Sequence, residues 1–164
     1  MTTHPMTRYL LVCFLLVTFG NIMGCTTAKG PLFVPATAPE AANTLLYVYR
    51  KNLGHFQSAY TPNVYIDDKP FVKLLREGYC YTYLIPGNHT ITFKHVFLAG
   101  HPKVDLPIFM EANKTYFVRV SDPIEPGALT TDYISRIQIV SNERGLAEIS
   151  STRLLVQEDI SGTK

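Results

Sequence analysis

Short runs of β-favouring residues, separated by turn residues, follow one another from Thr44 onward and restrict the fold more than any other feature. The clearest run is 79–84, YCYTYL, in which tyrosines alternate with Cys80, Thr82 and Leu84. Successive side chains of a strand point to opposite faces, so this run predicts a strand with one tyrosine face. Long helical patterns do not separate the runs, and a mainly β fold is therefore predicted.

The other predicted strands share β-branched or aromatic residues and flanking turn signals. They cover residues 44–50, 63–67, 71–76, 90–94, 104–110, 116–120 and 134–140. Tight turns at 67–70 and 86–88 link neighbouring strands, which we expect to pair antiparallel. Pro107 indicates a sheet edge, because proline cannot donate to a strand ladder. The expected architecture is an antiparallel β-sandwich of about seven strands.

One helical pattern lies near the end of the chain. Ser141 and Asn142 can cap a short helix over 143–150. Leu146 and Ile149 share one face of this helix, whereas Gly145 weakens it. We expect the helix to cover a sheet edge or an open end of the sandwich.

The first 24 residues have the layout of a signal peptide. Arg8 precedes an apolar run over 9–19, and this run is shorter than the about 20 residues that span a bilayer. Translation from Met6 instead of Met1 would give a more compact cationic region. A cysteine, Cys25, follows the apolar segment.

The sequence IMGC at 22–25 resembles the lipobox of bacterial lipoproteins. The resemblance implies cleavage between Gly24 and Cys25, and a diacylglyceryl group on the Cys25 thiol with acyl chains such as palmitate. Several acyl chains hold a protein on a membrane, whereas one myristoyl chain binds marginally. Thr26, where an aspartate would retain a lipoprotein at the inner membrane, implies the outer membrane. The alternatives are an ordinary signal cleavage site and an uncleaved anchor.

Residues 26–43 read as a tether between the lipid and the domain. Pro31, Pro35 and Pro39 exclude a regular helix, and a flexible coil of this length spans about 20–25 Å. Residues 32–34, LFV, either dock on the domain as an edge strand or stay solvated. The predicted organisation is a signal peptide at 1–24, a lipidated cysteine and tether at 25–43, a β-sandwich at 44–150 and a tail at 151–164.

The order of motifs over 44–149 resembles a family of bacterial lipoproteins defined by a domain of unknown function. The motifs are LLYVYRK at 45–51, NVYIDDKPF at 63–71, PGNHTITFK at 86–94, EANKTYFVRV at 111–120 and RGLAEI at 144–149. The Pro86-Gly87-x-His89 part is also similar to PEGA-type envelope β-domains. These resemblances imply an Ig-like or prealbumin-like sandwich, and they bring no catalytic residues.

Side chains that often carry chemistry have structural interpretations here. His89 and His95 lie about 20 Å apart on one extended strand, and neither His55 nor His101 completes a metal site, so we predict none. Asp67 and Asp68 are turn formers and not calcium ligands. Cys80 alternates with tyrosines, which indicates a buried thiol and not a reactive one. We expect no cofactor and no catalytic residues.

Tyr79, Tyr81 and Tyr83, together with Tyr47 and Tyr49, form the candidate binding face. The face binds an envelope protein or a glycan, or else it packs under the loop at 54–62 or under the terminal helix. Positive residues exceed negative ones by only two, and this balance without a basic stretch argues against nucleic acid.

The sequence predicts a lipid-anchored protein of the bacterial cell envelope that acts as a non-catalytic binding or structural module. One alternative is a secreted or periplasmic enzyme whose site is assembled from distant residues. Another is a secreted glycoprotein, because Asn88 and Asn113 fit the glycosylation sequon.

Overall fold

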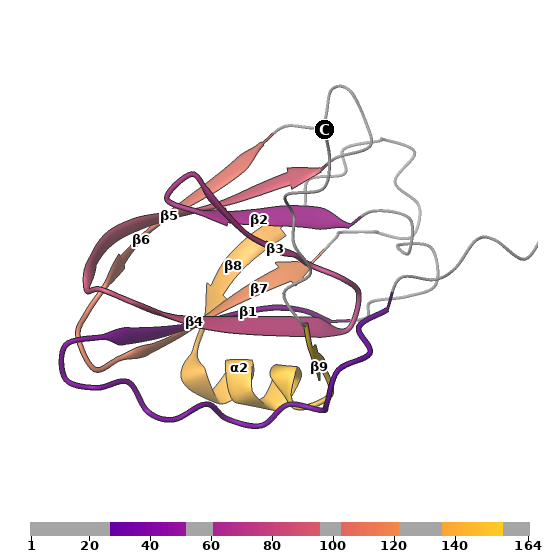
Figure 1. Ribbon diagram of the computed structural model, residues 1–164, viewed down its shortest axis with the longest axis horizontal. Helices are drawn as coiled ribbons and strands as arrows, with labels where there is room; N and C mark the ends of the chain where they lie inside the picture. Colours follow the sequence, from indigo (N-terminus) through magenta and orange to yellow (C-terminus); the bar gives the residue numbers. More distant parts are fainter. Residues whose placement is uncertain (1–26, 52–60, 96–102, 122–135, 156–164) are drawn as a thin grey trace, which may run out of the picture.

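The protein is a two-sheet β-sandwich with a partial third layer (Figure 1). The computed structural model describes residues 27–51, 61–95, 103–121 and 136–155. One sheet has the order β8 (Arg136–Val140), β7 (Thr115–Ser121), β1 (Thr44–Arg50), β4 (Gly78–Leu84) and β9 (Arg153–Leu154). The other has the order β3 (Lys69–Lys73), β2 (Pro62–Ile66), β5 (Gly87–His95) and β6 (Val104–Met110). The predicted mainly β sandwich is confirmed.

The main core lies between the two sheets. Alternate residues of the strands face inward, as the pleat of a strand requires. Side chains with essentially no exposure include Leu46, Val48, Val64, Ile91, Phe93, Met110, Val118 and Val120. Cys80 belongs to the same cluster, as its alternation with tyrosines predicts.

Strand pairing departs from the predicted all-antiparallel arrangement at two places. β1 pairs parallel to β7, with Leu46 opposite Tyr116 and Val48 opposite Val118. β4 pairs parallel to β9, a strand that lies in the predicted tail. Parallel neighbours need a long crossover connection. The strands of the other sheet lie between β1 and β7 in sequence, and pairing over such a distance leaves no local pattern.

Most of the tight turns connect the two sheets and do not form hairpins. The turn at Pro86 and Gly87 leads from β4 in one sheet to β5 in the other, so the expected pairing across it is wrong. Gly87 has a φ of 144°, a backbone conformation that favours glycine. The turn at Asp67 and Asp68 does close a hairpin, between β2 and β3. Their φ values of 50° and 63° match the two-residue hairpin turn.

Both edges of the four-stranded sheet carry a proline. β6 is one edge strand, and Pro107 lies in it opposite Thr90 of β5. β3 is the other edge strand and contains Pro70. The edge position predicted from Pro107 is confirmed.

The predicted helix is present as α2 (Asn142–Ile149), and the Ser141 hydroxyl accepts from the Arg144 backbone N–H at 3.4 Å. Its location differs from the prediction, because Ile149 packs on the outer face of the five-stranded sheet and not at an edge or open end. Leu146 is 45% exposed, so it does not share the buried face. Gly145 is instead buried, and a Cβ added there would lie 2.3 Å from Cγ of Phe117.

The segment predicted as a tether also packs on this outer face. Residues 27–42, hereafter the strap, first place Ala28 in the core between the sheets and then run along the same side of the sheet as α2 before the chain turns into β1 (Figure 1). Leu32 forms an isolated bridge to Arg153, and Phe33 packs against the aromatic cluster. Docking, one of the two alternatives for 32–34, is therefore the observed one.

β1 lies at the centre of the three layers and is buried along its whole length. Its even-numbered core residues Leu46 and Val48 face the other sheet. Leu45, Tyr47 and Tyr49 face α2 and the strap. This explains why residues 44–50 are apolar or aromatic at nearly every position and do not alternate with polar residues.

Candidate functional site

The tyrosine face predicted from β4 divides into a buried and an exposed part. Tyr79 is 2% exposed, whereas Tyr81 and Tyr83 are 38% and 41% exposed. All three lie on the outer face of the five-stranded sheet, and α2 and the strap do not cover that face completely. The exposed part of the candidate binding face is thus Tyr81 and Tyr83.

Phe33 of the strap is the side chain that covers Tyr79. Its ring makes edge-to-face contacts with Tyr79 at 5.2 Å and Tyr47 at 5.6 Å between centroids. Tyr47 in turn stacks on Phe117 at 5.0 Å, with an angle of 11° between the rings. Such pairs stabilise a fold beyond their buried area. The strap thus packs on Tyr79, and Ile149 of α2, the helix proposed from the sequence, belongs to the same buried cluster. Most of the loop at 54–62 lies outside the described residues.

Tyrosine hydroxyls hold the backbone of the strap. The Ala36 N–H donates to the Tyr47 hydroxyl at 2.7 Å, and the Tyr83 hydroxyl donates to the Thr37 carbonyl at 2.7 Å. The Val34 N–H makes a longer bond of 3.4 Å to the Tyr79 hydroxyl. Burial raises the pKa of Tyr47 despite the donated bond from Ala36, so this hydroxyl stays neutral.

Tyr81 and Tyr83 extend the aromatic cluster to the surface. Their rings meet edge-to-face at 6.3 Å, and Tyr81 lies 5.7 Å from Tyr47. Two exposed apolar residues of the strap, Leu32 and Val34, are 54% and 67% exposed. Rigid, half-exposed tyrosines are common in protein-binding surfaces because they lose little side-chain entropy on binding.

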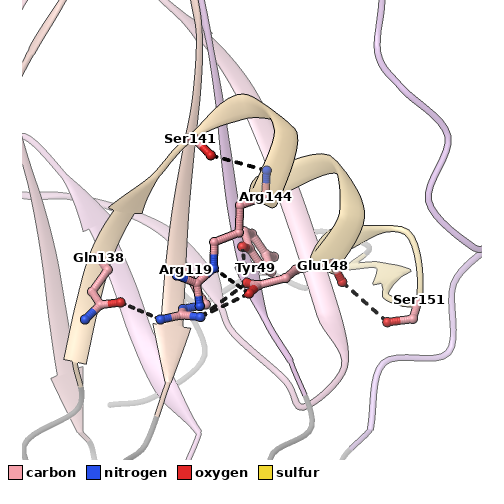
Figure 2. A network of polar contacts seen from close by, with 7 residues as sticks. All are labelled: Tyr49, Arg119, Gln138, Ser141, Arg144, Glu148 and Ser151. Atoms are coloured by element: carbon pink, nitrogen blue, oxygen red, sulfur yellow. Dashed lines mark hydrogen bonds and ion pairs between the residues drawn. The ribbon is translucent and has the colours of Figure 1, made fainter.

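A second polar site joins α2 to the sheet beneath it (Figure 2). Glu148 accepts from the Tyr49 hydroxyl at 2.7 Å and from Nε of Arg144 at 2.8 Å. Nη1 of Arg119 lies 3.1 Å from the same carboxylate, and its other terminal nitrogen bonds Gln138. Among the described residues, Nε of Arg119 has no hydrogen-bond partner.

The electrostatics of this cluster keep Glu148 ionised beside the Arg119 guanidinium. Burial opposes ionisation of Glu148, but the bonds from Arg144 and Tyr49 and the charge of Arg119 outweigh it and hold its pKa below the ordinary value. Burial, followed by the bond to Glu148, raises the pKa of Tyr49. A carboxylate that already accepts from three side chains is a structural group and a poor general base.

His89 sits in a separate polar contact at the β4–β5 turn. Its Nδ1 lies 2.7 Å from the Asp67 carboxylate and its Nε2 lies 2.7 Å from the Ile85 carbonyl. Burial lowers the pKa of His89, but the bonds to Ile85 and Asp67 outweigh it, and the pKa is raised overall. The other oxygen of Asp67 accepts from the Thr90 N–H at 2.9 Å. The His89 and Asp67 side chains thus join the turn between β4 and β5 to the turn between β2 and β3.

The structure also places the other residues that the sequence singled out for chemistry or modification. The Cys80 thiol is buried and lies 3.6 Å from the Val48 carbonyl, and burial raises its pKa. Asn88 is exposed, and Asn113 is an exposed turn residue with a φ of 58°. Gly24, Cys25, His55 and His101 lie outside the described residues, as does the His95 side chain.

The described residues contain neither a group of metal-ligating side chains nor a helix that could span a membrane. Nowhere in these segments do three or more His, Cys, Asp or Glu side chains group so that they could hold a metal ion. Within the same segments, the helix is neither long nor apolar enough to cross a membrane.

The sequence pointed to the tyrosines but not to their partners. Phe33 stands in a proline-rich segment of small residues, which is the only local signal that this part docks. Arg119 stands between apolar residues in 116–120, and a charge at that position indicates a buried ion pair. Its partner Glu148 lies 29 residues further along the chain and could not be inferred.

A search among curated proteins found no similar protein. The model of a family described as "Protein of unknown function (DUF2846)" matches residues 40–129, from the end of the strap through β7. This match covers more than half of the chain. The chain therefore belongs to this family of unknown function, as the motif order over 44–149 indicated.

Proposed function

We propose that this protein is a lipid-anchored component of a bacterial cell envelope, attached through Cys25, whose folded part is a non-catalytic binding or structural module. One observation carries the proposal: the IMGC sequence at 22–25 follows the apolar run and ends two residues before Thr27, which bridges to Arg76 of the domain. Cleavage before Cys25 would leave every described residue in the mature chain. Thr26 favours the outer membrane.

The character of the side-chain clusters supports a non-catalytic role. Glu148 is held by Tyr49, Arg119 and Arg144, and Cys80 is buried with a raised pKa. His89 and Asp67 each bond to neighbouring turns. Nucleophiles and general bases need a partner arrangement that leaves them free to react.

The surface around Tyr81 and Tyr83 is the proposed contact for another envelope component, a protein or a glycan. The two rings are exposed yet fixed by Tyr47 and by the bond from Tyr83 to Thr37. Fixed aromatic rings fit both the apolar face of a sugar and a protein partner.

Metabolic labelling with a palmitate analogue tests the anchor. The wild type should incorporate the label and start at Cys25, whereas Cys25→Ala should incorporate none and should accumulate as uncut precursor or be released. Cys13→Ala is the matched control, because it removes a thiol from the apolar run and leaves Cys25 in place. Labelling that survives Cys25→Ala, or an unacylated mature chain, would contradict the proposal.

Membrane fractionation tests the destination, and site-specific crosslinking tests the contact. Thr26→Asp should move the protein from the outer to the inner membrane fraction in a Gram-negative host.

A photo-crosslinking residue at Tyr81 or Tyr83 should capture an envelope component that the same residue at Tyr65, on the other sheet, does not. Equal capture from all three positions would argue against the tyrosine surface.

A further inference from the structure

The start of the strap fixes how far the domain can lie from Cys25. Thr27 forms an isolated parallel bridge to Arg76, and the Ala28 N–H donates to the Arg76 carbonyl at 3.0 Å. Ala28 is 4% exposed and belongs to the core between the sheets. The two residues from Cys25 to Thr27 span at most about 7 Å.

The rest of the predicted tether adds no reach, because it is bonded to the domain. The Phe33 N–H donates to the Thr152 carbonyl at 3.0 Å, and the Leu154 N–H donates to the Pro31 carbonyl at 2.8 Å. Further along, Tyr47 and Tyr83 hold the strap by the hydroxyl contacts described above. Releasing the strap would break these bonds and expose Phe33.

Cationic side chains surround the point where the strap begins. Lys29 is exposed, Arg76 is the bridge partner of Thr27, and Arg153 donates to the Gly30 carbonyl at 3.1 Å. Glu77, beside Arg76, is the one acidic residue in the described stretches 27–32, 74–79 and 152–155. Electrostatic attraction at physiological ionic strength acts over about 8 Å, which is comparable with the reach from Cys25.

We infer that the lipidated domain is seated directly on the bilayer in one orientation, with Lys29, Arg76 and Arg153 facing anionic lipid headgroups. The inference rests on the proposed lipid anchor at Cys25. It adds that the protein has a membrane-facing end, formed by the start of the strap and its neighbours in β9 and before β4. Basic residues close to a membrane surface are attracted to anionic lipids.

The opposite end of the sandwich then points away from the membrane. β1 and β4 each contain seven residues and run between the two ends, which separates the ends by about 20–25 Å. Tyr83 and Leu84 pair with Leu45 and Thr44 at the far end, followed by Ile85, which is 75% exposed. This end is where a component at a distance from the membrane would make contact.

Short-range fluorescence quenching tests the orientation. The full-length lipidated protein is placed in phosphatidylethanolamine–phosphatidylglycerol vesicles that contain headgroup-spin-labelled lipid. A fluorophore is attached either at Lys29→Cys or at Glu111→Cys, at the near and far ends; Cys80 is buried and does not compete. Quenching at position 29 should exceed quenching at position 111 at least about twofold, given a separation of about 20 Å.

A linker insertion is the matched control. About 12 glycine and serine residues between Thr26 and Thr27 add a coil of about 20 Å, so the difference between the two probes should shrink. In the protein labelled at Glu111→Cys, Lys29→Glu should increase quenching because the domain tilts, whereas Lys114→Glu, the same change at the far end, should not.

The outcomes separate the two proposals. Mass spectrometry of Cys25 reports the anchor, and a chain without a diacylglyceryl group there would refute the proposed function. A correctly lipidated protein whose two probes are quenched equally, with or without the linker, would overturn the inference alone. Equal effects of Lys29→Glu and Lys114→Glu would overturn the assignment of the cations.

Discussion

The two outer faces of this sandwich differ in what covers them. The outer face of the five-stranded sheet carries Tyr47, Tyr49, Tyr79 and Phe117, and α2 and the strap pack on it. The outer face of the four-stranded sheet carries polar contacts, such as Thr92 with Asp105 at 2.6 Å and Lys94 over the Tyr65 ring at 4.2 Å. Phe109 on that sheet is 64% exposed.

This difference shows which contacts stabilise the third layer, which α2 and the strap form. An aromatic side chain contributes most when both of its faces are removed from water. On the five-stranded sheet, outward aromatic residues therefore require a covering element, and Phe33, Gly145 and Ile149 supply the contacts. On the four-stranded sheet, the outward residues include polar pairs, which do not need apolar cover in this way.

The largest effect is expected from truncating the same residue type on the two sheets. Phe117→Ala should lower the free energy of unfolding by about 3–5 kcal/mol, because it leaves a cavity under α2 and removes the stack on Tyr47. Phe109→Ala should change it by less than about 0.5 kcal/mol. Urea denaturation of the two variants measures this difference, and similar losses would contradict the comparison.

A smaller effect on stability is expected at Gly145, where helix propensity and packing predict opposite signs. Helix propensity alone predicts that Gly145→Ala stabilises the protein by about 1 kcal/mol. The contact of 2.3 Å with Phe117 predicts the opposite, a loss of about 1–3 kcal/mol as α2 is pushed off the sheet. A thermal melt that shows stabilisation would mean that α2 does not pack this closely.

Truncating two neighbouring residues of the strap should have different effects on its protease resistance. Phe33→Ala removes two aromatic contacts and should cost about 1–2 kcal/mol, with faster proteolysis inside residues 27–42. Leu32→Ala, at a side chain that is 54% exposed, should leave the proteolysis rate nearly unchanged. Equal protease resistance of both variants would show that Phe33 does not hold the strap.

The smallest effect concerns pH at the far end of the sandwich. Despite burial, the pKa of His89 is raised in the folded state by its bonds to Ile85 and Asp67. These bonds therefore contribute fully to the free energy of unfolding below the unfolded pKa of histidine, near 6.5. The contribution is lost as the pH rises through the folded pKa. It should be below about 1 kcal/mol, since Asp67 is partly exposed.

Unfolding free energies measured from pH 5 to pH 9 test this sign. The wild type should lose stability relative to His89→Gln as the pH rises, and Asp67→Asn should reduce the loss while keeping the turn, because asparagine tolerates a positive φ. A wild type that gains stability over His89→Gln with rising pH would refute the assignment.

Much of the fold could be predicted because its signals are local. The alternation at 79–84 separated the tyrosine face of β4 from the face that carries Cys80, Pro107 marked the edge strand β6, and Ser141 capped α2. Each of these depends on a residue and its immediate neighbours. The tyrosines of the candidate site were found in the same way.

The errors concern contacts between distant residues. Leu146 and Ile149 satisfy the same helical periodicity, yet only Ile149 is buried, because the position of Phe117 decides which side of α2 faces the sheet. Phe33 reaches Tyr79 across 46 positions of sequence. Local patterns do not encode such pairings.

The sequence by itself determined that this chain is mainly β, where most strands and turns lie, and that Cys25 follows an apolar run, because strand periodicity, turn chemistry and hydropathy are read from adjacent residues. Only the tertiary structure decided that β1 pairs parallel to β7, that Glu148 is held by Arg119, and that residues 27–42 form a strap instead of a tether. The physical reason is that burial on both faces of β1 requires cover from segments far apart in sequence, which come together only on folding.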